Sequence, residues 1–154
     1  MPPPASISVV VPVYNGAATL DELVSRLVAV LRPRGAAFEL ILVNDGSRDD
    51  SWATITRLSA SVPELVGVDL LRNFGQHNAL LCGIRTARHD VIVTMDDDLQ
   101  QLPEEIPTLV AALGTDYDVV YGTAAQRPHG RARHLASRLT KAALRSTLGS
   151  DIAP

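Results

Sequence analysis

The chain has 154 residues, of which 46% are hydrophobic and 20% are charged, a composition typical of one soluble globular domain. Its only cysteine, Cys82, excludes an internal disulfide and a cysteine-based metal cluster. No apolar run approaches the roughly 18 residues that cross a bilayer, and residues 1–4 do not resemble a signal peptide, so we expect a cytoplasmic protein.

The formal net charge of −3 is unevenly distributed. Residues 1–118 hold 16 of the 17 acidic residues and eight of the 14 basic ones, a balance of −8, whereas residues 119–154 have a balance of +5. A basic end on an acidic body predicts an anionic partner at that end. We do not expect nucleic acid there, because the basic stretch has no interleaved aromatic residues for base stacking.

Strand patterns alternate with helical patterns along the chain after a leader of six residues. Strands are predicted over residues 7–13, 38–43, 65–71, 91–95 and 118–122, and helices over 19–33, 51–59, 78–87, a segment opened by Pro103, and about 132–148. We expect Thr19 to cap the first helix, Asp49 or Asp50 to cap the second, and Gly83 to allow close packing. The alternation predicts an α/β fold with a mostly parallel sheet.

Three consecutive carboxylates, Asp96, Asp97 and Asp98, follow the β-branched run at residues 91–95. The run is typical of a strand buried on both faces. Adjacent carboxylates repel one another, and a divalent cation is the simplest group that would offset them, although a solvated acidic turn is the alternative. Because side chains alternate along a strand, Asp96 and Asp98 are expected to face one way and Asp97 the other.

Polar residues follow three of the predicted strands, at Tyr14–Asn15, Asn44–Asp45 and the acidic run. If the strands are parallel, these residues meet in one crevice at the carboxyl edge of the sheet. The sequence has neither a dinucleotide-binding glycine fingerprint nor a Walker loop, so a diphosphate in that crevice would depend mainly on a metal. Asp45 is suited either to accept a hydrogen bond from a base or ribose, or to stabilise a turn or helix cap.

Four motifs, in their order and spacing, strongly resemble family 2 glycosyltransferases of the GT-A fold. They are Val10-Val11-Pro12-Val13-Tyr14-Asn15, Val43-Asn44-Asp45-Gly46-Ser47, Arg72-Asn73-Phe74-Gly75 and Asp96-Asp97-Asp98-Leu99-Gln100. The closest resemblance is to the branch that loads a sugar onto a polyprenyl phosphate, and it covers roughly residues 6–145. It implies a Rossmann-like GT-A fold with three α/β/α layers, and transfer of a sugar from a nucleoside-diphosphate sugar to a polyprenyl phosphate with inversion.

The resemblance also implies roles for individual residues. Nucleotide-sugar binding falls on Pro12, Tyr14, Asn15, Asp45, Gly75, Asp96 and Asp97. Binding of Mg²⁺ or Mn²⁺ falls on Asp96, Asp98 and Gln100. The catalytic residues are Asp98, which acts on the leaving group through the metal, and Arg127, which lies near a family arginine that contacts phosphate.

The basic residues near the end of the chain follow a helical spacing, with Arg131, Arg138 and Arg145 seven residues apart. A basic amphipathic helix of this kind can lie on an anionic membrane, or it can pack on the sheet with a solvated charged face. We expect it to approach the inner face of the membrane and a lipid-phosphate acceptor. We predict a nucleotide-sugar-binding domain over residues 7–130 and a helical tail over 131–154.

Other interpretations stay open at the sequence level. The relatives that the chain resembles continue beyond this length, so we expect a truncated chain whose own activity is uncertain. A non-catalytic nucleotide-sugar-binding fragment or partner module is the main alternative. A nucleotidyltransferase is less favoured, because the glycine-rich segment with a basic residue is missing after the first strand. The sequence does not specify the base, the sugar or the oligomeric state.

Overall fold

The computed structural model describes residues 5–114 and 117–122. The chain divides into two units at Tyr121, and the described fold is that of the first unit, Met1–Tyr121. Arg127 and the helix predicted at 132–148 lie outside the described residues. The domain boundary expected at residue 130 stays a prediction.

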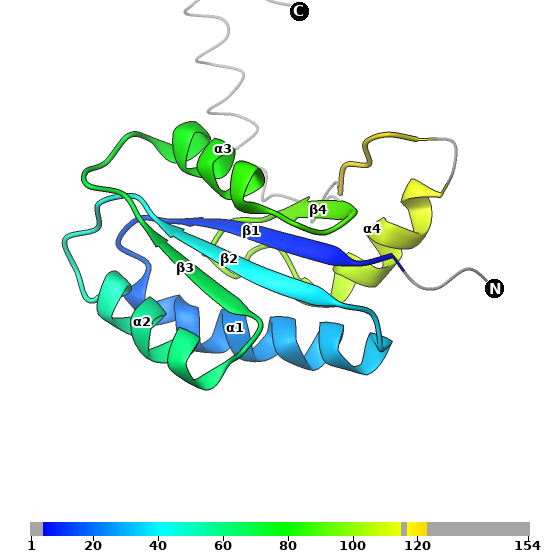
Figure 1. The fold of residues 1–154 in the computed structure, drawn as a ribbon, viewed down its shortest axis with the longest axis horizontal. Helices are drawn as coiled ribbons and strands as arrows, with labels where there is room; N and C mark the ends of the chain where they lie inside the picture. Colours follow the sequence, from blue (N-terminus) through cyan, green and yellow to red (C-terminus); the bar gives the residue numbers. More distant parts are fainter. Residues whose placement is uncertain (1–4, 115–116, 123–154) are drawn as a thin grey trace, which may run out of the picture. The chain divides into compact units, whose positions relative to one another are not determined.

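Four parallel strands form the central sheet (Figure 1). They are β1 (Ile7–Val13), β2 (Phe38–Asn44), β3 (Leu65–Asp69) and β4 (Val91–Thr94), in the spatial order β3-β2-β1-β4. β1 and β2 are buried over almost their whole length, as expected for apolar strands with a helical layer on each face. The prediction of a mostly parallel α/β sheet is confirmed.

Helices cover both faces of this sheet. They are α1 (Ala17–Leu31), α2 (Ser51–Ser61), α3 (Gln76–Thr86) and α4 (Ile106–Leu113), with short 3₁₀ turns η1 (Arg32–Arg34) and η2 (Pro103–Glu105). α1 and α2 lie on one face and α3 lies on the other, packed mainly on β1 and β2 (Figure 1). The helix predicted to open at Pro103 is confirmed as η2 followed by α4.

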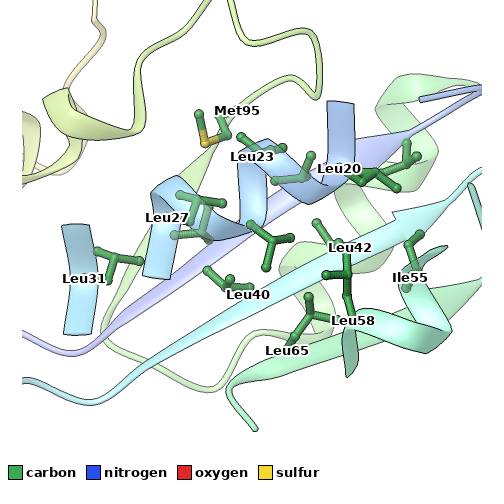
Figure 2. Close-up of a cluster of buried hydrophobic side chains, with 14 of the residues drawn as sticks. Leu20, Leu23, Leu27, Leu31, Leu40, Leu42, Ile55, Leu58, Leu65 and Met95 are labelled. Carbon is green, nitrogen blue, oxygen red and sulfur yellow. The ribbon is translucent and has the colours of Figure 1, made fainter. Parts of the chain in front are cut away.

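The main core lies between α1, α2 and the sheet (Figure 2). α1 contributes a stripe of fully buried leucines at helical spacing, Leu20, Leu23, Leu27 and Leu31. Burial of each leucine stabilises the fold by about 1.5–3 kcal/mol. Met95, directly after β4, joins the same cluster, so the residues that lead into the acidic run are fixed by the core.

A second, smaller core joins α3 to the opposite face of the sheet. Val10, Ile41 and Val43 form it together with Ala79. Gly83 lies directly against the sheet, because a Cβ at this position would overlap a methyl of Val10. The expected close packing at Gly83 is confirmed.

The cap of α1 differs from the prediction, whereas the expected capping of α2 by Asp49 or Asp50 is confirmed. α1 begins at Ala17, two residues before the expected cap Thr19, whose hydroxyl donates instead to the carbonyl of Gly16. Asp50 occupies the N-cap position of α2, but its side chain makes no capping bond. Asp49 accepts the hydrogen bonds at the α2 N-terminus instead.

The expected strand at 118–122 is wrong, because the structure describes residues 117–122 and assigns no strand to them. Tyr117, Val119 and Tyr121 are 66%, 60% and 85% exposed. β-branched and aromatic residues favour strands only where a neighbouring strand pairs with them.

β4 is buried on one face only, so the prediction of burial on both faces is also wrong. Val91 and Val93 pack against the main core, whereas Ile92 is 40% exposed. Among the described residues β4 pairs only with β1, and α3 packs mainly on β1 and β2. A continuous apolar run therefore does not show how many faces a strand buries.

A buried carboxylate, Glu39, joins β2 to the turn before β4. Its oxygens accept hydrogen bonds from the Ser8 hydroxyl at 2.7 Å, from the Arg88 backbone N–H at 2.8 Å and from the Arg88 guanidinium at 2.8 and 3.0 Å. Burial alone raises the pKa of Glu39, but the hydrogen bonds from Ser8 and Arg88 outweigh it and leave the pKa below its ordinary value.

We expect Glu39→Gln to lower the free energy of unfolding by about 1–3 kcal/mol at pH 7, because the buried Ser8 hydroxyl and the more exposed Arg88 lose a charged acceptor. A lowered native pKa stabilises the fold above the unfolded-state value of 4.5, and this contribution is lost as the pH falls through the native value. Urea titrations at pH values from 7 to below 4.5 should therefore show that the difference in the free energy of unfolding between wild type and variant becomes smaller as the pH falls. Glu104→Gln, which breaks a half-exposed pair with Arg26, is the control and should change stability much less. Equal losses in the two variants would contradict the role of Glu39.

Candidate active site

The carboxyl ends of the strands meet at one edge of the sheet, because Val13 is level with Asn44 and Asn44 with Asp69. β2 and β3 follow β1 on one side of it in the sheet. After β3 the chain passes through α3 to β4, which pairs with β1 on its other side. In open α/β sheets this change of direction is where ligands bind. β4 ends level with Val10, so the residues after it run beside the last part of β1.

A cleft of about 360 Å³ lies at this point. The residues that line it come from all four strand ends: Pro12, Val13, Tyr14, Asp45, Asn73, Gln76, Asp96, Asp97 and Asp98. Tyr14 is 47% exposed and offers an aromatic face to a ligand. The cleft thus combines one aromatic ring, two neutral side-chain amides and four carboxylates.

The loops after β1 and β2 are bonded to each other. Asn15 adopts a left-handed conformation with φ 55°, and its backbone N–H donates to the Ser47 hydroxyl at 3.0 Å. Its side-chain oxygen accepts from the backbone N–H of Arg48 at 2.8 Å. Asn15 therefore shapes the edge of the cleft through backbone contacts and is not among the lining residues.

Asp49 joins the N-termini of α1 and α2. One of its oxygens accepts from the backbone N–H of Ala17 at 3.1 Å, and the other accepts from the backbone N–H and the hydroxyl of Ser51. Burial raises the pKa of Asp49, but these hydrogen bonds outweigh it and hold the pKa below its ordinary value. Asp49 stays charged at two helix N-termini, where a negative charge is favourable.

Asp45 is almost fully buried, 2% exposed, and connects the loop after β2 to the loop after β3. Its two oxygens accept from the backbone N–H groups of Phe74 and Gly75, at 2.7 and 2.9 Å. Each carboxylate oxygen has a further lone pair, so these bonds leave capacity for a ligand donor. Asp45 therefore supports the loop before α3 and also lines the cleft.

The acidic run lies beyond β4, which ends at Thr94. Asp96, Asp97 and Asp98 all line the cleft and lie in the bent segment that follows the strand, so the expected alternation of their side chains stays a prediction. Leu99, with φ 60°, turns the chain in a conformation unusual for a leucine, and its side chain packs against the main core. A turn anchored in the core, not an extended strand, directs the three carboxylates.

Asp97 lies in the least favourable surroundings of the three. Its Oδ2 is buried and accepts no hydrogen bond from the described residues. A Cβ at Gly16 would overlap this oxygen, so glycine is required there for Asp97 to fit. Burial raises the pKa of the Asp97 carboxyl, and the charges of Asp98, Asp96 and Asp49 raise it further. A cation in the cleft would relieve this repulsion.

The carboxylate oxygens on the turn are suitable ligands for a hard divalent cation. Asp98 is exposed, and its Oδ1 accepts from the backbone N–H of Gln100 at 2.9 Å, while Oδ2 is free of hydrogen bonds from the described residues. Both Asp96 oxygens accept from side-chain amides instead. In the described part of the chain, no three His, Cys, Asp or Glu side chains surround one point. This arrangement matches Mg²⁺ sites in which one or two carboxylates act together with substrate phosphates.

Six of the predicted site residues line one cleft: Pro12, Tyr14, Asp45, Asp96, Asp97 and Asp98. Gly75 is the residue directly before α3 and has φ 91°. Its backbone N–H donates to Asp45, and the residue does not line the cleft. Gln100 is exposed beside Asp98, and Arg127 lies outside the described residues. The roles assigned to these residues stay predictions.

Sequence reasoning missed three residues that line the cleft, Val13, Asn73 and Gln76. It also missed Gln101, which bonds to Asp96. Asn73 and Gln76 follow β3 and could have been found by applying the strand-end rule to every strand. Gln101 carried no such signal, because its partner is set by the turn at Leu99.

The sequence profile of glycosyl transferase family 2 matches residues 8–149, and the chain belongs to this family. A curated relative from Shewanella sediminis is 42% identical over 148 residues and is named undecaprenyl-phosphate 4-deoxy-4-formamido-L-arabinose transferase. The alignment covers 95% of this chain and 44% of the relative. This chain therefore spans less than half the length of that relative.

Two solved structures share the fold. Glucosyl-3-phosphoglycerate synthase from Mycobacterium tuberculosis, in complex with phosphoglyceric acid, superposes with a TM-score of 0.61 at 28% identity and covers 97% of this chain and 54% of that one. A mannosyltransferase from Pyrobaculum calidifontis, in complex with GDP-Man and Mn²⁺, gives 0.64 at 24% identity and covers 79% and 36%. The expected GT-A fold is confirmed.

None of the helices in the described part of the chain has the length and apolar character to cross a bilayer.

Proposed function

We propose that the cleft binds a nucleoside-diphosphate sugar together with Mg²⁺ or Mn²⁺, and that the protein transfers the sugar to undecaprenyl phosphate or a similar polyprenyl phosphate. The observation that carries this proposal is the convergence of Tyr14, Asp45 and the three carboxylates in one cleft of a family 2 chain. The name of the 42% identical relative supports the choice of acceptor.

The chemistry follows from the residues of the cleft. Tyr14 and Pro12 provide apolar surface for the base, and Asp45 provides an acceptor for a base or ribose donor. Asp98 and Gln100 are the proposed ligands of the cation, with Asp96 beside them. When bound, the cation stabilises the charge that develops on the departing diphosphate.

The proposed transfer inverts the anomeric configuration. A phosphate oxygen of the acceptor forms a bond to the anomeric carbon, while the bond from that carbon to the diphosphate breaks and its electron pair leaves with the diphosphate. A lipid phosphate carries about −1.5 to −2 charge at neutral pH, so it needs little help from a general base. Arg127 is the proposed contact for a phosphate, and the reaction would take place at the inner face of the membrane.

Calorimetry with UDP, GDP and dTDP, each with and without Mn²⁺, tests the donor site. We expect at least one nucleotide to bind, with an affinity about tenfold or more higher in Mn²⁺, because the acidic turn repels a free diphosphate. If none of the three shows metal-dependent binding, the proposed donor site is wrong.

A transfer assay separates the enzyme from its main alternative. The assay combines the nucleoside-diphosphate sugar that matches the bound nucleotide with undecaprenyl phosphate and follows formation of the lipid-linked sugar. Product formation by this chain supports the proposed reaction. Metal-dependent nucleotide binding without turnover would favour a nucleotide-sugar-binding module that requires further chain or a partner.

A further inference from the structure

The carboxylate of Asp96 is held from two sides by neutral amides. Gln76, the first residue of α3, donates from Nε2 to Asp96 Oδ1 at 2.7 Å. Gln101 donates from Nε2 to Asp96 Oδ2 at 3.1 Å. Both carboxylate oxygens are thus engaged, which limits rotation of the Asp96 side chain.

Gln101 also bonds to the backbone of the same residue. Its Oε1 accepts the backbone N–H of Asp96 at 3.2 Å, so the single amide makes two contacts with Asp96. These contacts close a ring around residues 97–100, which include Asp98. In the described part of the chain no backbone–backbone hydrogen bond joins residues within 96–101, so side chains hold this turn.

The neutrality of the two amides matters for the chemistry. Lysine or arginine beside Asp96 would also stabilise its carboxylate, but either would cancel part of the negative charge that attracts a divalent cation. An amide orients the carboxylate and leaves the full charge of the turn in place. In metal sites, partners that orient ligands in this way commonly change metal affinity by about 10–100-fold.

We propose that Gln76 and Gln101 are positioning residues that set the geometry of the acidic turn for a metal–nucleotide complex, an inference that rests on the proposed function. Gln101 holds the turn in a closed conformation and so places Asp98. Gln76 connects the turn to the N-terminal end of α3, whose preceding loop is held by Asp45. The loop after β3 and the turn after β4 therefore act on the ligand as one unit.

Gln101→Met and Gln76→Met test this proposal, because methionine keeps the length of the side chain and removes the amide. We expect each variant of the 154-residue chain to lower the Mn²⁺-dependent affinity for the nucleoside diphosphate by about tenfold. For Gln101→Met, binding without Mn²⁺ and the melting temperature should stay close to wild type, because Gln101 does not line the cleft. Glu105→Met is the matched control, since Glu105 is exposed and its side chain makes no hydrogen bond with the described residues. In Gln101→Met, equal losses with and without Mn²⁺, or no loss, would overturn the proposal.

A second measurement does not depend on nucleotide binding. Backbone ¹⁵N relaxation of residues 97–100 should give order parameters near 0.85 in the wild type and about 0.6 in Gln101→Met. Unchanged order parameters would show that Gln101 does not hold the turn. If the wild type binds no nucleoside diphosphate with Mn²⁺, the proposed function fails, and the relaxation data still decide whether Gln101 positions the turn.

Discussion

Replacement of Asp98 by alanine is expected to abolish metal-dependent nucleotide binding. Asp98 is exposed at the cleft, and its Oδ2 is free of hydrogen bonds from the described residues, so it is the carboxylate best placed to ligate a cation. Loss of an indirect partner commonly weakens metal affinity by about 10–100-fold, so loss of a ligand should weaken it by about 100-fold or more. Calorimetric titration of the nucleotide in Mn²⁺ measures this directly.

Asp97→Ala is the comparison that makes the result specific. Asp97 also lines the cleft, but its Oδ2 is buried against Gly16, and burial raises the pKa of its carboxyl. Removal of this carboxylate relieves repulsion within the turn, so we expect a much smaller loss of Mn²⁺-dependent affinity and no loss of stability. Equal losses in the two variants would show that the cation is shared by the whole acidic run.

Gly46→Ala should cause the largest loss of stability among changes near the cleft. Gly46 has φ 63°, and a Cβ there would lie 2.5 Å from the carbonyl carbon of Arg72 and even closer to the backbone nitrogen of Asn73. Left-handed backbone costs about 1–2 kcal/mol for alanine, and overpacking adds about 1–3 kcal/mol. We expect a loss of about 3 kcal/mol, or about 10 °C in the melting temperature.

Gly35→Ala separates these two causes. Gly35 has nearly the same φ, 67°, but its Cβ would have no described neighbour within 4 Å. This variant should lose only the conformational part, about 1 kcal/mol. Thermal melts of the two variants give the difference, and equal losses would show that the approach of the loops at Gly46 adds nothing.

Prediction from the sequence was most accurate where burial repeats with a regular period. The leucine stripe of α1 and the apolar runs of β1 and β2 predicted the bounds of these elements to within a few residues. The reason is that one side of the helix and both faces of each strand are buried. The parallel order then followed from alternation of strands and helices. The strand ends already predicted that Tyr14, Asp45 and the acidic run would meet.

Prediction was least accurate where the strand pairing or burial of a residue depends on a neighbour distant in sequence. Residues 118–122 have strand propensity, but no strand is assigned to them in the described structure, and β4 buries one face instead of two. Ladder pairing and burial are properties of two elements together, so one segment cannot show them. The same limit hid the bond between Gln76 and Asp96, which are 20 positions apart.

The sequence alone therefore determined the α/β class, the family resemblance and the set of strand ends that form the cleft. Local periodicity and motif spacing are sufficient for that. Only the tertiary structure decided how the carboxylates differ: Asp96 is held by two amides, Asp97 is buried against Gly16, and Asp98 is open to the cleft. Three identical side chains in a row are chemically equivalent in the sequence, and only the packing around the turn gives each a distinct environment.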